Sequence, residues 1–215
     1  MEKLTLQKLK KEIDDLKKNV NSKFELNNNQ ETPILSSFTE IGTEIDVGKL
    51  GKIRLLDTNY NGTGKKIWQF VNVLKPDKVK LGLPDDNNDG GYPSAKGIHE
   101  SLQEIYDELP MYIKNQIVES IIPCYIPKDK KETKYKTKLF LLSATEMCSN
   151  RPYAPIESRP LEFYIRNIPL WNDWQWIRSP YPSYSNYWVR VSVDGTISYY
   201  LTYYNGGVAP AFCTD

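Results

Sequence analysis

The chain has 215 residues, of which 40% are hydrophobic and 12% aromatic, and 28 Lys and Arg residues against 27 Asp and Glu residues leave a formal net charge of +1. This apolar content is too high for a disordered chain, and the charge is too small to create a general field that attracts nucleic acid or an acidic membrane. We therefore expect a folded protein without nucleic acid among its partners.

The first 24 residues carry apolar side chains spaced alternately by three and four positions, which is a heptad pattern. A helix this short is marginal in water unless its apolar stripe is buried. We expect residues 1–24 to form a coiled-coil oligomerisation helix, residues 25–33 a linker, and residues 34–215 the main domain; packing of the helix on its own domain is the alternative. The predicted oligomerisation residues are Leu6, Leu9, Ile13, Leu16 and Val20.

The sequence contains no membrane-spanning stretch, because no apolar run approaches the roughly 20 residues that a bilayer requires. The charged residues at the start do not resemble a signal peptide, so we expect synthesis in the cytoplasm without membrane insertion. Cys124, Cys148 and Cys213 lie far apart and form no CxxC pair. We expect three reduced, buried thiols.

Residues 33–150 combine strand-like and helix-like patterns. Apolar runs at residues 53–56 and 67–71, joined by a turn at residues 61–64, predict an antiparallel pair. Apolar residues at helical spacing from Ile98 to Ile121, interrupted by Pro110, predict two short helices that meet at this proline.

The next two segments differ sharply in polarity. Residues 128–138 are rich in lysine, and Asp129 and Glu132 dilute their positive charge, which indicates a solvated loop rather than a nucleic-acid site. Residues 139–142 read Leu-Phe-Leu-Leu, a short continuous apolar run that predicts a central strand buried on both faces.

Beyond residue 150 most of the aromatic residues of the chain gather, and two strand-like runs flank Asp194-Gly195. A two-residue loop would place valines on the same face as Ser198 and Thr202. A three-residue loop over residues 193–195 instead pairs Val191 with Ile197 and makes one face uniformly apolar. We therefore predict a β-hairpin with the three-residue loop.

The opposite face of this hairpin would carry aromatic rings, hydroxyl groups and one guanidinium group. Tyr and Trp offer large contact areas at low entropic cost, and Arg adds bidentate hydrogen bonding or stacking. We predict a ligand-binding face, with coverage by the preceding Pro- and Tyr-rich loop as the alternative. The predicted ligand-binding residues are Trp188, Arg190, Tyr200, Tyr204 and Asn205.

Motifs for catalysis or metal binding are weak. His99 is the only histidine and has no Ser or Cys motif beside it, so we interpret it as a residue in the first turn of a helix. Residues 85–90 imitate the opening of an EF-hand loop, but position 12 is Lys96 rather than the required Glu. We expect no enzyme, no catalytic residues, no cofactor and no metal. The weak candidates for calcium ligands are Asp85, Asn87 and Asp89.

Four motifs, in order, resemble the DUF6273 family of uncharacterised domains. They are LFLLSATE at residues 139–146, WQWIRSP at 174–180, VDG at 193–195 and GVAPAF at 207–212. The sequence departs from the family pattern at Ala209, where Arg is usual, so no role of that Arg can be transferred. A second departure is Ile177 in place of Leu.

The resemblance implies a C-type-lectin-like fold. We thus expect an α+β domain with an antiparallel sheet and two short helices, preceded by the coiled coil. By their positions in the motifs, Trp176, Arg178 and Phe212 are expected to form a structural framework: a core tryptophan, an arginine that binds loop carbonyls, and a final strand that closes the fold.

The resemblance also implies a setting, since such domains occur in phage and prophage virion proteins and in surface proteins of Gram-positive bacteria. We expect an oligomeric virion protein of the tail- or head-fibre type that binds a cell-surface ligand, expected to be a glycan. Oligomerisation can raise avidity by roughly 10²–10⁴ over a single site. The heptad residues favour a dimer and analogy favours a homotrimer. The alternatives are a structural or decoration protein that contacts another virion protein, and a cell-envelope enzyme.

Overall fold

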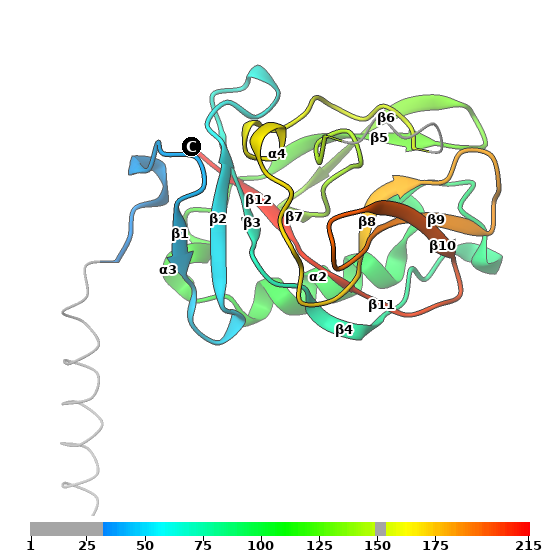
Figure 1. Ribbon diagram of the computed structural model, residues 1–215, viewed down its shortest axis with the longest axis horizontal. Helices are drawn as coiled ribbons and strands as arrows, with labels where there is room; N and C mark the ends of the chain where they lie inside the picture. Colours follow the sequence, from blue (N-terminus) through cyan, green and yellow to red (C-terminus); the bar gives the residue numbers. More distant parts are fainter. Residues whose placement is uncertain (1–31, 149–153) are drawn as a thin grey trace, which may run out of the picture. The chain divides into compact units, whose positions relative to one another are not determined.

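A computed structural model describes residues 32–148 and 154–215 (Figure 1). All the elements named below belong to one compact unit, Ile34–Asp215. The predicted coiled coil over residues 1–24 lies outside the described residues, so the roles of Leu6, Leu9, Ile13, Leu16 and Val20 stay predictions. In the described part of the chain, no helix is both long enough and apolar enough to cross a membrane.

The first sheet has five antiparallel strands in the order β1-β2-β3-β12-β7. The β2–β3 pair confirms the antiparallel pair predicted around the turn at residues 61–64. Strand β12 lies between β3 and the edge strand β7, so it is an interior strand of the sheet (Figure 1). The strands are β1 (Glu44–Asp46), β2 (Lys52–Asp57), β3 (Lys66–Phe70), β7 (Leu139–Phe140) and β12 (Ala211–Thr214).

The buried run at residues 139–142 is not the central strand that its composition predicts. Only its first two residues pair, and β7 is the edge strand of the sheet. Side chains take up the next backbone groups: the Leu141 N–H donates to the Tyr92 hydroxyl at 3.2 Å, and the Leu141 carbonyl accepts from Arg178 at 2.9 Å. Buried backbone groups need hydrogen-bond partners, which can be side chains as well as backbone. Here the side chains of Tyr92 and Arg178 make bonds that a second neighbouring strand would otherwise make.

The second sheet has five strands in the order β10-β9-β8-β11-β4. The β11–β8 pair is parallel and the other pairs are antiparallel. Every residue of β8 is buried, and a bulge interrupts its pairing with β9 between Trp176 and Pro180. The strands are β4 (Leu74–Val79), β8 (Gln175–Pro180), β9 (Tyr187–Val191), β10 (Ile197–Leu201) and β11 (Gly206–Val208).

The α-helices of the described residues are α2 (Lys96–Glu108), α3 (Met111–Lys114) and α4 (Glu162–Arg166). Helices α2 and α3 meet at Pro110, which confirms the predicted helix pair. Helix α2 contacts β7 of the first sheet and β4 of the second. The described part is therefore α+β with mainly antiparallel strands, as predicted.

A separate two-stranded hairpin, β5 (Ser120–Ile126) with β6 (Lys131–Thr137), corrects two expectations. The spacing of apolar residues predicted that the second helix extends to Ile121. In the structure, buried and exposed residues alternate from Ser120 onward, as in a strand: Ile121 is exposed and Ile122 is buried. The Lys-rich segment is largely a strand rather than a loop: from Glu132 onward exposed positions, which include Lys134 and Lys136, alternate with half-buried ones.

The cysteines are free thiols. Cys124 and Cys213 are buried as expected, and burial raises the pKa of each thiol to about 12. Cys148 is exposed, so the expectation of three buried thiols is wrong at this residue.

Candidate ligand-binding site

The β9–β10 hairpin has the predicted register. Val191 pairs with Ile197, and the Ser192 N–H donates to the Thr196 carbonyl at 2.9 Å, which leaves residues 193–195 as the loop. Gly195 has φ +79°, in the left-handed region that a three-residue hairpin loop assigns to glycine. The local turn chemistry therefore fixes which side chains share the outer face.

Trp188 is not available on that face, so the prediction of a ligand contact at this residue is wrong. Its side chain is 0% exposed, and its indole N–H donates to the Ile177 carbonyl at 2.6 Å, at the bulge of β8. Thr202 is buried on the same face and its hydroxyl donates to the Asp86 carbonyl at 2.6 Å. The segment around Asp86 thus lies against this end of the hairpin.

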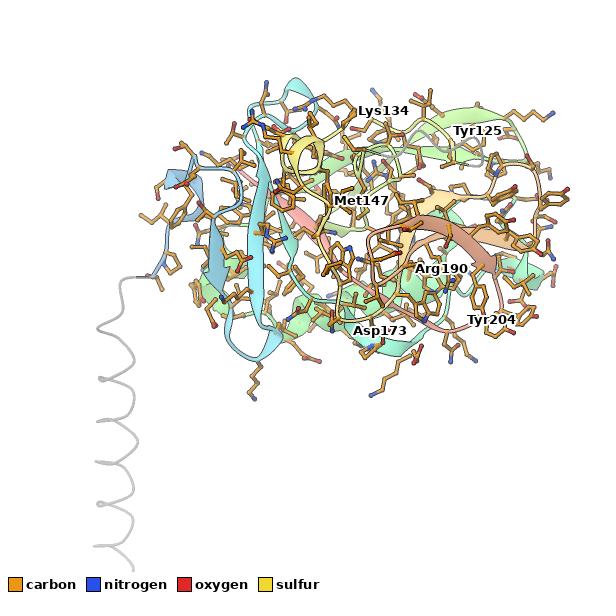
Figure 2. All side chains as sticks on the ribbon, in the orientation of Figure 1. Tyr125, Lys134, Met147, Asp173, Arg190 and Tyr204 are labelled. Atoms are coloured by element: carbon orange, nitrogen blue, oxygen red, sulfur yellow. The ribbon has the colours of Figure 1, made fainter. Side chains whose placement is uncertain are left out.

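Beyond Trp188, an arginine and four aromatic side chains form one row. The Arg190 Cζ atom lies 4.5 Å from the Tyr200 ring centroid and 5.1 Å from that of Trp174. The Tyr200 and Tyr204 centroids are 4.3 Å apart with planes at 24°, and those of Tyr204 and Tyr203 are 4.7 Å apart with planes at 31°. We call these five residues the Arg–aromatic ladder; Figure 2 labels Arg190 and Tyr204 within it.

The order of the ladder decides which surfaces a ligand can reach. Arg190 lies over the Tyr200 ring, Tyr200 stacks with Tyr204, and Tyr204 packs against Tyr203, so Tyr200 and Tyr204 each have two neighbours within the ladder. The Tyr200 ring is partly buried, and Tyr204 is 40% exposed. The one terminal tyrosine, Tyr203, is 56% exposed and can present a ring face.

Three predicted ligand-binding residues belong to the site as the structure builds it. Arg190, Tyr200 and Tyr204 are brought together in the ladder, and Asn205 is exposed in the loop directly after it. Sequence reasoning missed Trp174 and Tyr203. Trp174 lies directly before β8 and two positions before Trp176, a spacing that places both rings on one side where the chain is extended; their centroids are 4.9 Å apart.

A shallow hollow of about 520 Å³ adjoins the Trp174 end of the ladder. Two of its apolar lining residues are well exposed: Leu170 is 78% exposed, and Val193 at the hairpin tip is half exposed. Its polar walls come from β9 and the hairpin loop. The lining residues are Leu170, Trp174, Arg190, Ser192, Val193 and Asp194.

The Pro- and Tyr-rich loop before β9 does not cover the ladder. Its tyrosines pack with residues of the other hairpin face: the Tyr181 and Tyr199 centroids are 4.8 Å apart, and Tyr184 lies 6.0 Å from Tyr187. The buried Asn88 amide holds this loop, because its Nδ2 donates to the carbonyls of Tyr181, Tyr184 and Tyr187 at 2.8, 3.0 and 2.7 Å. Carbonyls only accept, which fixes the orientation of the amide.

We expect Asn88→Ala to lower the free energy of unfolding by about 2 kcal/mol, since three carbonyls lose a buried donor. Urea unfolding measures this, and hydrogen exchange should show faster exchange over residues 181–187. Asn87→Ala is the matched control, because Asn87 bonds only locally, to the Asp89 N–H at 2.8 Å. Unchanged exchange over residues 181–187 in Asn88→Ala would contradict this role.

Trp176, Arg178 and Phe212 are all buried in the interior, as a framework role requires. Arg178 donates to the Pro123 carbonyl of strand β5 at 3.0 Å and to the Leu141 carbonyl, directly after β7, at 2.9 Å, so only one of these two carbonyls lies in a loop. Arg178 also forms a buried ion pair with Glu146 that the sequence did not indicate.

The weak metal candidates form a turn. Over residues 32–148 and 154–215, no three His, Cys, Asp or Glu side chains gather closely enough to hold a metal ion, and this includes Asp85 and Asp89. His99 lies in the first turn of α2, as predicted, and its Nε2 bonds to the Tyr92 carbonyl at 2.9 Å. Because a carbonyl only accepts, Nε2 carries the proton. Burial lowers the pKa of His99.

Comparison with known proteins gives one match. The family model described as "Domain of unknown function (DUF6273)" matches residues 98–215, more than half of the chain, and this span contains the whole Arg–aromatic ladder. Neither the curated proteins nor the solved structures contain a match.

Proposed function

The chain belongs to the DUF6273 family, and we propose that its domain is a non-enzymatic binding module that holds a cell-surface glycan on the Arg–aromatic ladder. The observation that carries this proposal is the exposed end of the ladder. The Tyr203 ring face and the Arg190 guanidinium lie along one row on the hairpin of the second sheet. One sugar of a glycan can stack its C–H face on such a ring, while the hydroxyl groups of another sugar along the same chain accept hydrogen bonds from Arg.

We also propose the setting: a C-type-lectin-like head on an oligomeric phage or phage-like virion protein, with a homotrimer favoured over a dimer and release of the protein without a signal peptide. Two features support this proposal. The final strand, β12, closes the first sheet between β3 and β7. The heptad pattern of residues 1–24 suits self-association, and several weak sites side by side would raise avidity.

The test is binding of the fluorescently labelled full chain to intact Gram-positive cells and to purified wall polysaccharides. We expect Tyr203→Ala to weaken binding by roughly tenfold, because it removes the most exposed ring of the ladder. Tyr184→Ala is the matched control, since Tyr184 is an exposed tyrosine of the other cluster. Equal loss in both variants would argue against the ladder, and no binding by the unaltered chain would overturn the proposal.

A second candidate function is a structural or decoration protein that contacts another virion protein. The exposed side chains of Ile168, Leu170 and Val193 favour it, because they lie together around the hairpin tip: the Trp171 N–H donates to the Val193 carbonyl at 2.8 Å. Apolar groups gathered in this way are typical of protein contacts. Assembly onto particles that Leu170→Ser abolishes, without binding to cells, would support this function over the first.

A further inference from the structure

Arg190 is a cation without a carboxylate partner in the described residues. Its guanidinium group lies in the corner between the rings of Trp174 and Tyr200, whose planes meet at 78°. Its Nε donates to the Ser198 hydroxyl at 3.2 Å, and over residues 32–148 and 154–215 no hydrogen bond or ion pair uses its two terminal nitrogens. The donors of these nitrogens remain for a ligand.

The environment of Arg190 favours a negatively charged partner. The two rings remove water from part of the guanidinium group and restrict its orientation, so less side-chain entropy is lost when a ligand binds. Planar guanidinium donors match the two oxygens of a carboxylate or phosphate, and such charge-assisted bonds are stronger than bonds to neutral hydroxyl groups. A neutral sugar would leave this pairing unused.

We propose that the glycan bound by the ladder is acidic, and that Arg190 pairs with its carboxylate or phosphodiester group at the edge of the hollow. This inference rests on the proposed function, because it names the chemical class of ligand for the same site. The terminal Tyr203 then stacks on a neighbouring sugar ring. The acidic group supplies specificity through Arg190, and the ring supplies contact area.

Asp194 limits the strength of this anion site. It lines the same hollow, and its carboxylate accepts the Thr196 N–H at 2.9 Å, which lowers the pKa of Asp194 and keeps it ionised. A negative ligand beside Arg190 therefore meets a fixed negative charge within the hollow. Asp194→Asn keeps the oxygen that accepts from Thr196 and suits a turn before Gly195, so it removes only the charge.

The experiment compares oligogalacturonate with its fully methyl-esterified form, by calorimetry on the full chain. The two probes differ in charge and share their sugar rings. We expect the charged form to bind about tenfold more tightly, in line with hydrogen bonds to charged groups, and salt to weaken this preference. Arg190→Met should abolish the preference, and Asp194→Asn should strengthen binding of the charged form alone. Poly(glycerol phosphate) is the phosphodiester counterpart and distinguishes phosphate from carboxylate.

The outcomes separate this inference from the proposed function. Equal affinity for oligogalacturonate and its ester, with no binding of poly(glycerol phosphate), overturns the inference that the ligand is acidic. In that case, cell binding that depends on Tyr203 still supports the proposed glycan-binding module. A preference that survives in a folded Arg190→Met variant overturns the assignment to Arg190. A gain of affinity in Asp194→Asn supports the assignment to Arg190, because an unfolded variant would not bind more tightly. The absence of binding to cells and to every polysaccharide overturns both.

Discussion

Replacement of Arg178 by methionine is expected to lower the free energy of unfolding by about 3–5 kcal/mol, the range for breaking a buried ion pair. Arg178 and Glu146 are both 0% exposed, and two bonds of 2.6 and 2.7 Å join them. Without the arginine, Glu146 would still accept hydrogen bonds from the Tyr60 hydroxyl and the Ser143 N–H, but it would remain a buried charge without a counterion. The Pro123 and Leu141 carbonyls would lose their donor as well.

Urea unfolding of the full chain measures this effect. The matched control is Lys136→Met, which breaks an exposed ion pair of the same length: Lys136 and Glu119 are 2.6 Å apart and both are largely solvated. Exposed pairs contribute about 1 kcal/mol or less. The double variant Arg178→Met/Glu146→Leu should be more stable than Arg178→Met, because it removes the unpaired charge. Similar losses in Arg178→Met and Lys136→Met would contradict the role of the pair.

The parts of the fold that local chemistry determines could be predicted from the sequence. Asp194-Gly195 fixes the hairpin loop, and the alternation of apolar residues fixes its register, so Val191 pairs with Ile197 as expected. The helix break at Pro110 follows from the missing N–H and the ring of proline. Each of these features depends on residues within a few positions of one another.

Features that depend on distant residues could not be predicted. The outer face of the hairpin carries aromatic and polar side chains along its length, but two of them are buried by distant parts of the chain. The Thr202 hydroxyl donates to the Asp86 carbonyl, and the Trp188 indole donates to the Ile177 carbonyl of β8. Lys134 and Lys136 follow the period of a strand, yet the charge of the segment suggested a loop, because nothing in that segment shows that β5 would pair with it.

The candidate site was predicted in part for the same reason. The same face of the hairpin carries Arg190, Tyr200 and Tyr204. The alternation of side chains along the two paired strands is enough to predict that they lie close together. Trp174 joins them from the segment before β8, and this contact requires the order of strands in the sheet. The sequence also could not show that Tyr200, Tyr204 and Tyr203 stack in that order, because stacking order depends on side-chain conformations.

A second buried carboxyl group, that of Glu157, makes the stability of the domain depend on pH. Glu157 is 0% exposed; its Oε1 accepts the Tyr125 N–H at 2.8 Å and its Oε2 accepts from the Ser179 hydroxyl. The described residues include no ion pair to Glu157, since Arg178 pairs with Glu146. Burial, partly offset by the nearby charge of Arg178, raises the pKa of Glu157 from 4.5 to about 7.

The direction of the pH dependence follows from this raised pKa. Below the unfolded value of 4.5 the carboxyl group is protonated in both states, and its contribution to stability is fully present. As the pH rises from 4.5 to about 7, the unfolded chain releases the proton first, so the folded state loses stability. Above that range both states are ionised and the loss, about 3 kcal/mol, is complete.

Glu157→Gln should remove this dependence, because the amide stays neutral and its oxygen can still accept the Tyr125 N–H. We expect the unfolding free energy of the variant, relative to the unaltered chain, to rise by about 2–3 kcal/mol between about pH 5 and about pH 8. Urea unfolding across this range measures the difference, which also cancels the titration of other groups. Glu132→Gln, at an exposed position of β6, should give a constant difference. A constant difference for Glu157→Gln as well would show that Glu157 titrates alike in the folded and unfolded chain, and the buried carboxyl group would then be ionised throughout.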